Sequence, residues 1–142
     1  AVKVAKDVAV RLKAEKNESF DGTRKGIFRF ATATDDERRK KIAENPLYGK
    51  IVCRCENVTE GEIVDSIARP LGAVDLDGVK RRTRAGMGRC QSGFCCTRVM
   101  EILSEQLGVP FEDIKLNGNG KMVVGRLKQN GVGRPLGRLE EI

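Results

Sequence analysis

Five cysteines are the residues of this chain best suited to chemistry, and their spacing gathers them in two places. One residue separates Cys53 from Cys55, and four residues separate Cys90 from Cys95, which is followed directly by Cys96. Two close thiol pairs in one domain form the pattern of a four-thiolate site, because each pair supplies two ligands from a single loop. Such a site suits either a tetrahedral zinc ion or an iron–sulfur cluster.

The spacing and the local charge favour the cluster. Structural zinc usually takes cysteine pairs separated by two to four residues, and the Cys53–Cys55 pair is tighter than that. A 2Fe-2S cluster with four thiolates has a negative charge, and several basic residues lie close in sequence to the second pair to balance it: Lys80, Arg81, Arg82, Arg84 and Arg89. From spacing alone, a structural or sensing zinc site and redox-active or unpaired thiols stay open as alternatives.

Cys96 is the odd thiol of the five. We interpret it as a small buried residue of the last helix. A substitute ligand for Cys95 and a reactive thiol are the alternatives.

Composition narrows the chemistry further. The 142 residues include no His, which excludes His-based acid–base catalysis and His metal ligands, and we predict no catalytic residue in this chain. The net charge of +7 is spread among acidic residues, and the basic run 80–84 lacks stacking aromatics, so we expect no nucleic-acid partner. No apolar run is long enough to span a bilayer and no secretion signal is visible. We therefore predict a cytoplasmic location, with membrane association only through a partner subunit.

Periodicity and capping patterns predict a mainly helical fold with at most one or two short strands. Residues 1–16 have the period of a one-sided helix that needs a partner surface, on its own domain or on a neighbouring one, and an arm follows it. Capping boxes begin helices at Thr34 and Thr59, and Asp75 or Asp77 begins another. The remaining expectations are a helix at 95–107, a helical turn at 110–114, a strand at 121–127 and a Gly- and Arg-rich tail at 128–142.

Two segments resemble a known family. Residues 51–63 read IVCRCENVTEGEI and residues 76–91 read LDGVKRRTRAGMGRCQ. Both are similar to the bacterioferritin-associated-ferredoxin-like 2Fe-2S domain, in the form found at the C-terminus of FAD-dependent oxidoreductases of the anaerobic glycerol-3-phosphate dehydrogenase type. The resemblance covers roughly residues 46–127. It implies a small helical 2Fe-2S-binding domain whose ligands are Cys53, Cys55, Cys90 and Cys95.

The resemblance also implies a division of the chain and a set of partners. Residues 1–45 would be the helix and arm that connect to a flavin domain, residues 46–127 the cluster domain, and residues 128–142 a tail outside the likeness. FAD would belong to the missing domain only, because no strand–loop–helix here has the dinucleotide-binding glycine pattern. The chain would then pass electrons from a flavin domain or flavoprotein subunit to an acceptor subunit, without being catalytic by itself. One departure from the family is Cys96, which stands where Gly is common.

Overall fold

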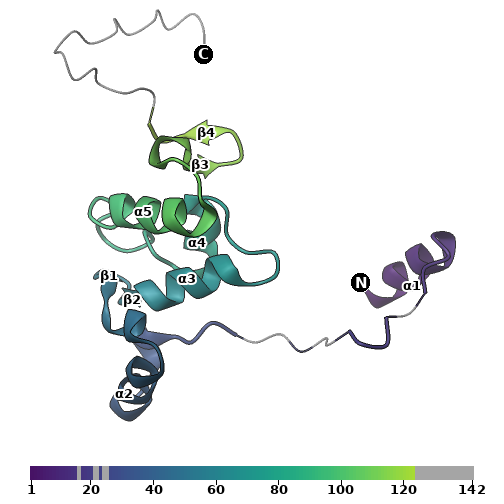
Figure 1. Ribbon diagram of the computed structural model, residues 1–142, viewed down its shortest axis with the longest axis horizontal. Coiled ribbons are helices and arrows are strands. Elements are labelled where there is room, and N and C mark those ends of the chain that lie inside the picture. The colour runs from purple at the N-terminus through teal and green to yellow at the C-terminus, as the bar shows by residue number, and fades with distance from the viewer. Residues whose placement is uncertain (16, 21–22, 24–25, 124–142) are drawn as a thin grey trace, which may run out of the picture.

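The chain folds into short helices joined by turns (Figure 1). The computed structural model describes residues 1–15, 17–20, 23 and 26–123. The α-helices are α1 (Val2–Arg11), α2 (Asp35–Glu44), α3 (Glu60–Ala68), α4 (Leu76–Thr83) and α5 (Cys96–Leu107). The 3-10 helices are η1 (Phe30–Thr32), η2 (Pro46–Gly49) and η3 (Phe111–Asp113). The strands are β1 (Ile51–Cys53), β2 (Val58–Thr59), β3 (Lys115–Asn117) and β4 (Gly120–Lys121). The mainly helical class is confirmed. The described residues form four short strands rather than the one or two expected, as the antiparallel pairs β1–β2 and β3–β4.

Side-chain caps fix where three of these helices begin. Thr34 and Thr59 each form the full capping box predicted for them, with Glu37 and Glu62 respectively. Of the two candidates for α4, Asp75 is the cap, and its Oδ1 accepts the N–H of Gly78 at 2.6 Å. Because the caps are local, these boundaries follow from the sequence.

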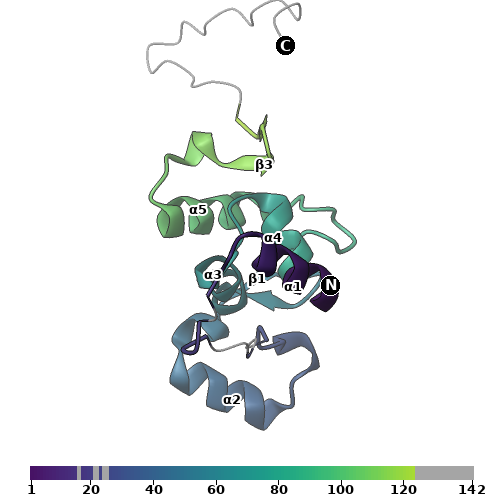
Figure 2. The same ribbon diagram turned by 90° about the vertical axis from the view of Figure 1, so that its right-hand side faces the viewer.

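The hydrophobic core lies among α3, α4 and α5. α3 contacts both of the other helices, and the buried side chains include Ile63, Val79, Ile102 and Leu103. Figure 2 shows the three helices in the middle of the molecule, with β1 beside α3. The core therefore lies directly under the segments that contain the cysteines.

The arm before α2 packs against the start of α3. The N–H of Phe30 donates to Glu62 Oε1 at 3.2 Å, and Phe30 itself is buried. The ring of Phe28 meets the buried ring of Tyr48 edge to face at 5.6 Å, and the Tyr48 hydroxyl donates to Asp65 on α3. Residues 28–30 are thus part of the same packed body as α3.

One expectation about the position of a strand needs correction. Of the strand predicted at 121–127, Lys121 lies in β4, whereas Met122 and Val123 lie outside any strand and residues 124–127 fall outside the described residues. The strand forms earlier because a turn at Gly118, with φ of +41°, pairs β3 with β4. The tail predicted at 128–142 also lies outside the described residues.

The predicted N-terminal helix forms as α1, but it does not pack on its own domain. None of its residues is buried, and Figure 1 shows it standing apart from the helical body. Its valines are exposed and have no cover within the described part of the chain. None of the helices in this part has the length and apolarity that crossing a membrane needs.

Candidate metal centre

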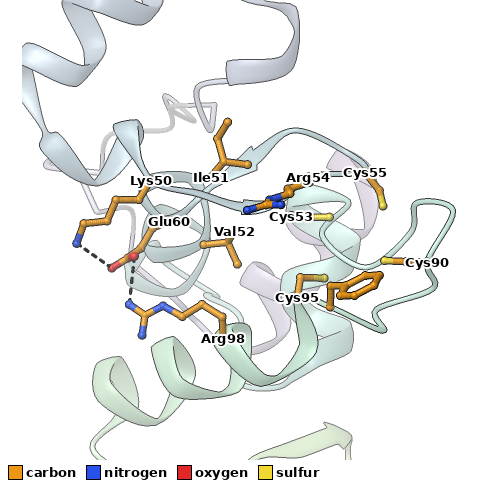
Figure 3. Close-up of a pocket in the computed structure, with 11 residues that line it drawn as sticks. Lys50, Ile51, Val52, Cys53, Arg54, Cys55, Glu60, Cys90, Cys95 and Arg98 are labelled. Carbon is orange, nitrogen blue, oxygen red and sulfur yellow. Dashed lines mark hydrogen bonds and ion pairs between the residues drawn. The ribbon is translucent and has the colours of Figure 1, made fainter.

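The four cysteines proposed as ligands line one pocket. Its volume is about 720 Å³, and its walls include Cys53 and Cys55 from the first loop and Cys90 and Cys95 from the second. Figure 3 shows the four sulfur atoms facing a shared space. The fold therefore brings together two cysteine pairs that have 34 residues between them along the chain.

The first thiol loop is the turn of the β1–β2 hairpin. Cys53 ends β1 opposite Val58, and Cys55 lies in the turn between the strands. Asn57 closes the turn with φ of +52°, a left-handed conformation that Asn tolerates better than most residues. β2 continues directly into α3 through the Thr59 cap, so the helix N-terminus holds the hairpin in place.

The second thiol loop joins α4 to α5. It contains several residues in the left-handed region, among them Gly86, Gln91 and Ser92. The Ser92 hydroxyl donates to the carbonyl of Gly86 at 3.3 Å, and the Gln91 amide donates to the carbonyl of Gly88 at 2.9 Å. These bonds fold the loop back on itself. Cys90 therefore lies in the loop, and Cys95 lies at the N-cap position of α5.

The four thiols form two neighbouring pairs that differ in burial, and each loop contributes one thiol to each pair. Cys53 and Cys95 are neighbours and are 1% and 3% exposed, as members of the hydrophobic core. Cys55 and Cys90 are also neighbours, with Cys55 exposed and Cys90 partly exposed. The pocket thus has a buried half and an open half.

The electrostatics of the thiols differ between the halves. Burial, together with the nearby Cys53, raises the pKa of Cys95 to about 12. The backbone N–H of Phe94 lowers the pKa of Cys90, with further contributions from the Cys55 side chain and from the N–H groups of Ser92 and Gly93. Cys90, in the open half, is thus disposed toward the thiolate form, whereas burial disfavours ionisation of Cys95 in the buried half.

The donor set fits a two-iron cluster. Four cysteine thiols lie on the pocket wall. Among the described residues that line it, Glu60 is the one other side chain of a type that commonly binds metals. In the described part of the chain, no group of three or more His, Cys, Asp or Glu side chains is arranged to hold a single metal ion. A 2Fe-2S cluster instead takes two thiolates on each of two irons, and two thiol pairs are what the pocket presents.

Cys96 lies apart from the other four. It is partly buried on α5, does not line the pocket, and its Sγ lies 4.0 Å from the Sδ of Met100. Burial raises the pKa of its thiol. Cys96, the first residue of α5, therefore packs against the hydrophobic core.

Two ion-pair systems flank the pocket, and sequence reasoning missed most of their members. Beside the buried half, Glu60 accepts from Arg98 at 3.1 Å and lies 3.8 Å from Lys50 Nζ. Beside the open half, Glu56 pairs with Arg84 at 2.7 Å. The sequence shows that Glu56 and Glu60 lie close to the first cysteine pair. It does not show that Arg84 and Arg98 are their partners.

The basic residues expected beside the second cysteine pair divide into two groups. Arg84 pairs with Glu56, the residue that follows the pocket cysteine Cys55. Lys80 and Arg81 instead pair with Asp77 on their own helix, and Arg82 donates to the carbonyls of Gly78 and Leu71. Three of the five residues are therefore engaged elsewhere.

Comparison with known proteins agrees with this geometry. Residues 51–105 match the family model described as the BFD-like 2Fe-2S binding domain. The chain is 44% identical over 123 residues to a glycerol 3-phosphate dehydrogenase of Caloramator mitchellensis, which covers 87% of this chain and 25% of that protein. It is 39% identical over 62 residues to an anaerobic glycerol-3-phosphate dehydrogenase subunit of Escherichia coli strain K12, covering 44% of this chain and 11% of that protein.

A third relative belongs to a differently named enzyme. The chain is 36% identical over 83 residues to the hydrogen cyanide synthase subunit HcnB of Pseudomonas aeruginosa, covering 57% of this chain and 18% of that protein. The chain thus spans a quarter or less of the length of these relatives. No solved structure matches it. The matched segment, residues 51–105, contains both thiol loops and the helices that hold them, and this segment is similar to the BFD-like 2Fe-2S binding domain.

Proposed function

We propose that this chain transfers electrons, one at a time, between a flavin and a further acceptor as part of a FAD-dependent dehydrogenase. The observation that supports the proposal most is the convergence of Cys53, Cys55, Cys90 and Cys95 on one pocket from two loops. These four residues are the proposed ligands of a 2Fe-2S cluster, and Cys96 is proposed to be outside the ligand set.

A 2Fe-2S cluster supplies the capacity to take up and release a single electron. The protein supplies its surroundings. Cys53 and Cys95 keep water from the buried half, and the backbone N–H groups that point at Cys90 stabilise a thiolate on the open half. The open half, with Cys55 exposed, is the side at which an electron can cross to or from a partner over a short distance.

The proposed partners are an electron-acceptor subunit and either a flavin domain or a flavoprotein subunit. The relatives named as dehydrogenases are several times longer than this chain, which leaves room in them for a flavin domain. We assign residues 1–45 to the connection with that domain and residues 46–127 to the cluster domain. The uncovered valines of α1 fit this assignment, because such a helix face is stable only against another surface.

The substrate of the whole enzyme is proposed to be glycerol 3-phosphate or a related 2-hydroxy compound. The names of two relatives support this choice. The likeness to a protein named as a hydrogen cyanide synthase subunit supports the view that such a domain accompanies more than one chemistry, with the substrate selected outside residues 51–105. We also propose a cytoplasmic location, which the five free thiols support.

A redox titration tests the electron-transfer role. The full chain, reconstituted with iron and sulfide without oxygen, should show one reversible one-electron transition, and Cys96→Ser should leave it unchanged. Cys55→Ser and Cys90→Ser should abolish it. A chain that holds zinc on the four thiols and shows no transition would instead be a structural module, and would contradict the proposal.

A further inference from the structure

One ion pair ties the two thiol loops together at the exposed cysteine. Glu56 follows Cys55 directly, and its Oε2 lies 2.7 Å from Nε of Arg84, a residue 28 positions away in the sequence. The Glu56 side chain is 20% exposed and that of Arg84 is 56% exposed. This pair and Glu60–Arg98 both join residues far apart in the sequence. Glu60 and Arg98 line the pocket, whereas Glu56 follows the pocket residue Cys55 in the chain.

The backbone at Arg84 has a conformation that is unusual for a residue with a side chain. Arg84 ends α4 with φ of +72°, in the left-handed conformation that most side chains avoid. Glycine is the usual residue at such a helix end, because it adopts this conformation without a steric penalty. An arginine here accepts unfavourable backbone geometry, and the contact that its side chain gains is the one with Glu56.

The same two loops also touch directly at Cys55. A Cβ built on Gly88 would overlap the Cβ of Cys55 and come within 3.3 Å of its carbonyl carbon. The absence of a side chain at Gly88 lets the first loop approach the second, and the Glu56–Arg84 pair closes beside this contact. Arg81 is different, because it lies on the same helix but pairs with Asp77 on that helix.

We propose that Glu56 and Arg84 are positioning residues. Their ion pair holds Cys55 against the second thiol loop and so keeps the two thiols of the open half together. The inference rests on the proposed function in that Cys55 is taken as a ligand. Cys53 and Cys95 need no such device because the hydrophobic core holds them. Cys55 lies in an exposed turn, and contacts between the loops are what fix it.

The rate at which a chelator removes iron from the loaded full chain tests the proposal. Glu56→Gln and Arg84→Gln should each speed the loss of iron to excess EDTA by about fivefold, the effect of losing one well-formed surface ion pair. The double variant should lose iron no faster than either single variant, because both remove the same contact. Arg81→Gln is the matched control and should leave the rate unchanged. The swapped pair, Glu56→Arg with Arg84→Glu, should restore the slow rate.

The direction in which each single variant changes the rate of iron loss distinguishes a positioning role from a simple charge effect. If the residues acted only through their charges on the cluster, Glu56→Gln and Arg84→Gln would change the rate in opposite directions. That result, or two unchanged rates, would overturn the proposal.

Hydrogen exchange of residues 54–57 in the metal-free full chain gives a second readout that needs no cluster. Both single variants should speed exchange there, and Arg81→Gln should not. A chain that never binds iron would overturn the proposed function, and this exchange measurement would then decide the positioning role alone. Unchanged exchange in both variants would overturn that role.

Discussion

The two halves of the metal centre are built in different ways. Cys53 and Cys95 belong to the hydrophobic core and lie at the end of β1 and the start of α5, so the folding of α3, α4 and α5 places them. Cys55 and Cys90 lie in turns, where left-handed residues and a few cross-loop contacts hold them. The buried half is thus a product of packing, and the open half is a product of loop geometry.

This difference has a consequence for how the metal centre forms. Metal binding couples to folding where the ligands are not already in place. Here the buried pair is in place once the core has formed, so binding has to order only the open pair. The same division leaves Cys55 exposed to solvent while Cys53 and Cys95 are buried.

The largest expected contrast comes from replacing one cysteine in each half. Cys53→Ser and Cys90→Ser should both abolish cluster binding, measured as iron per chain. In the metal-free chain, only Cys53→Ser should lower the free energy of unfolding substantially, by about 1–3 kcal/mol, because it buries a hydroxyl in an apolar site. Cys90→Ser should stay within about 0.5 kcal/mol. Cys96→Ser should keep its iron, and loss of iron there would show that the ligand set is wrong.

A methyl group at the contact between the loops should disturb the open half. Gly88→Ala places a Cβ against Cys55 and should destabilise the loaded protein by about 1–3 kcal/mol, as overpacking does. Gly49→Ala is the matched control, because its Cβ would make only an ordinary 3.5 Å contact with Ile42. Iron content and thermal unfolding measure both. Full iron content and an unchanged melting temperature in Gly88→Ala would show that the loops do not need this close approach.

Removing the cap of the helix beside each thiol loop compares the supports of the two loops. Thr59→Ala removes the cap of α3 and a buried partner of Glu62, and should cost about 2 kcal/mol. Asp75→Ala removes the more exposed cap of α4 and should cost about 1 kcal/mol. Urea unfolding of the metal-free chain measures both free energies. An equal or larger cost for Asp75→Ala would contradict the view that the first hairpin depends more strongly on its buried support.

The smallest expected contrast lies between the two flanking ion pairs. Arg98→Gln leaves Glu60, whose side chain is 10% exposed, with Lys50 at 3.8 Å as its remaining ion-pair partner. It should cost about 1–2 kcal/mol of unfolding free energy, because a poorly solvated carboxylate loses its nearer cation. Arg84→Gln should cost at most about 1 kcal/mol, since its pair is more exposed. The same unfolding measurement would reject this ranking if Arg84→Gln proved the more costly.

The sequence predicted those parts of the fold that local chemistry determines. The capping boxes at Thr34 and Thr59 and the helix that ends at Leu107 follow from short motifs and apolar spacing. The four pocket cysteines were identified from their spacing and from a family resemblance. Their division into a buried and an open pair was not predicted, because it depends on how two loops approach across the core.

Long-range partners were the main gap. Glu56 and Arg84 are each ordinary in the sequence, and only the fold shows that they meet. Lys80 and Arg81 each pair with Asp77 on the same helix, and the sequence alone did not indicate these partners. Charge counts along a sequence predict an average field but do not determine which residue pairs with which.

The most direct test of the central claim is the iron and acid-labile sulfide content of the full chain, purified without oxygen, together with its visible spectrum. We predict about two irons and about two sulfides per chain, with absorption that bleaches on reduction by dithionite. Stoichiometric zinc without sulfide, even after anaerobic reconstitution, would contradict a 2Fe-2S centre on these four cysteines.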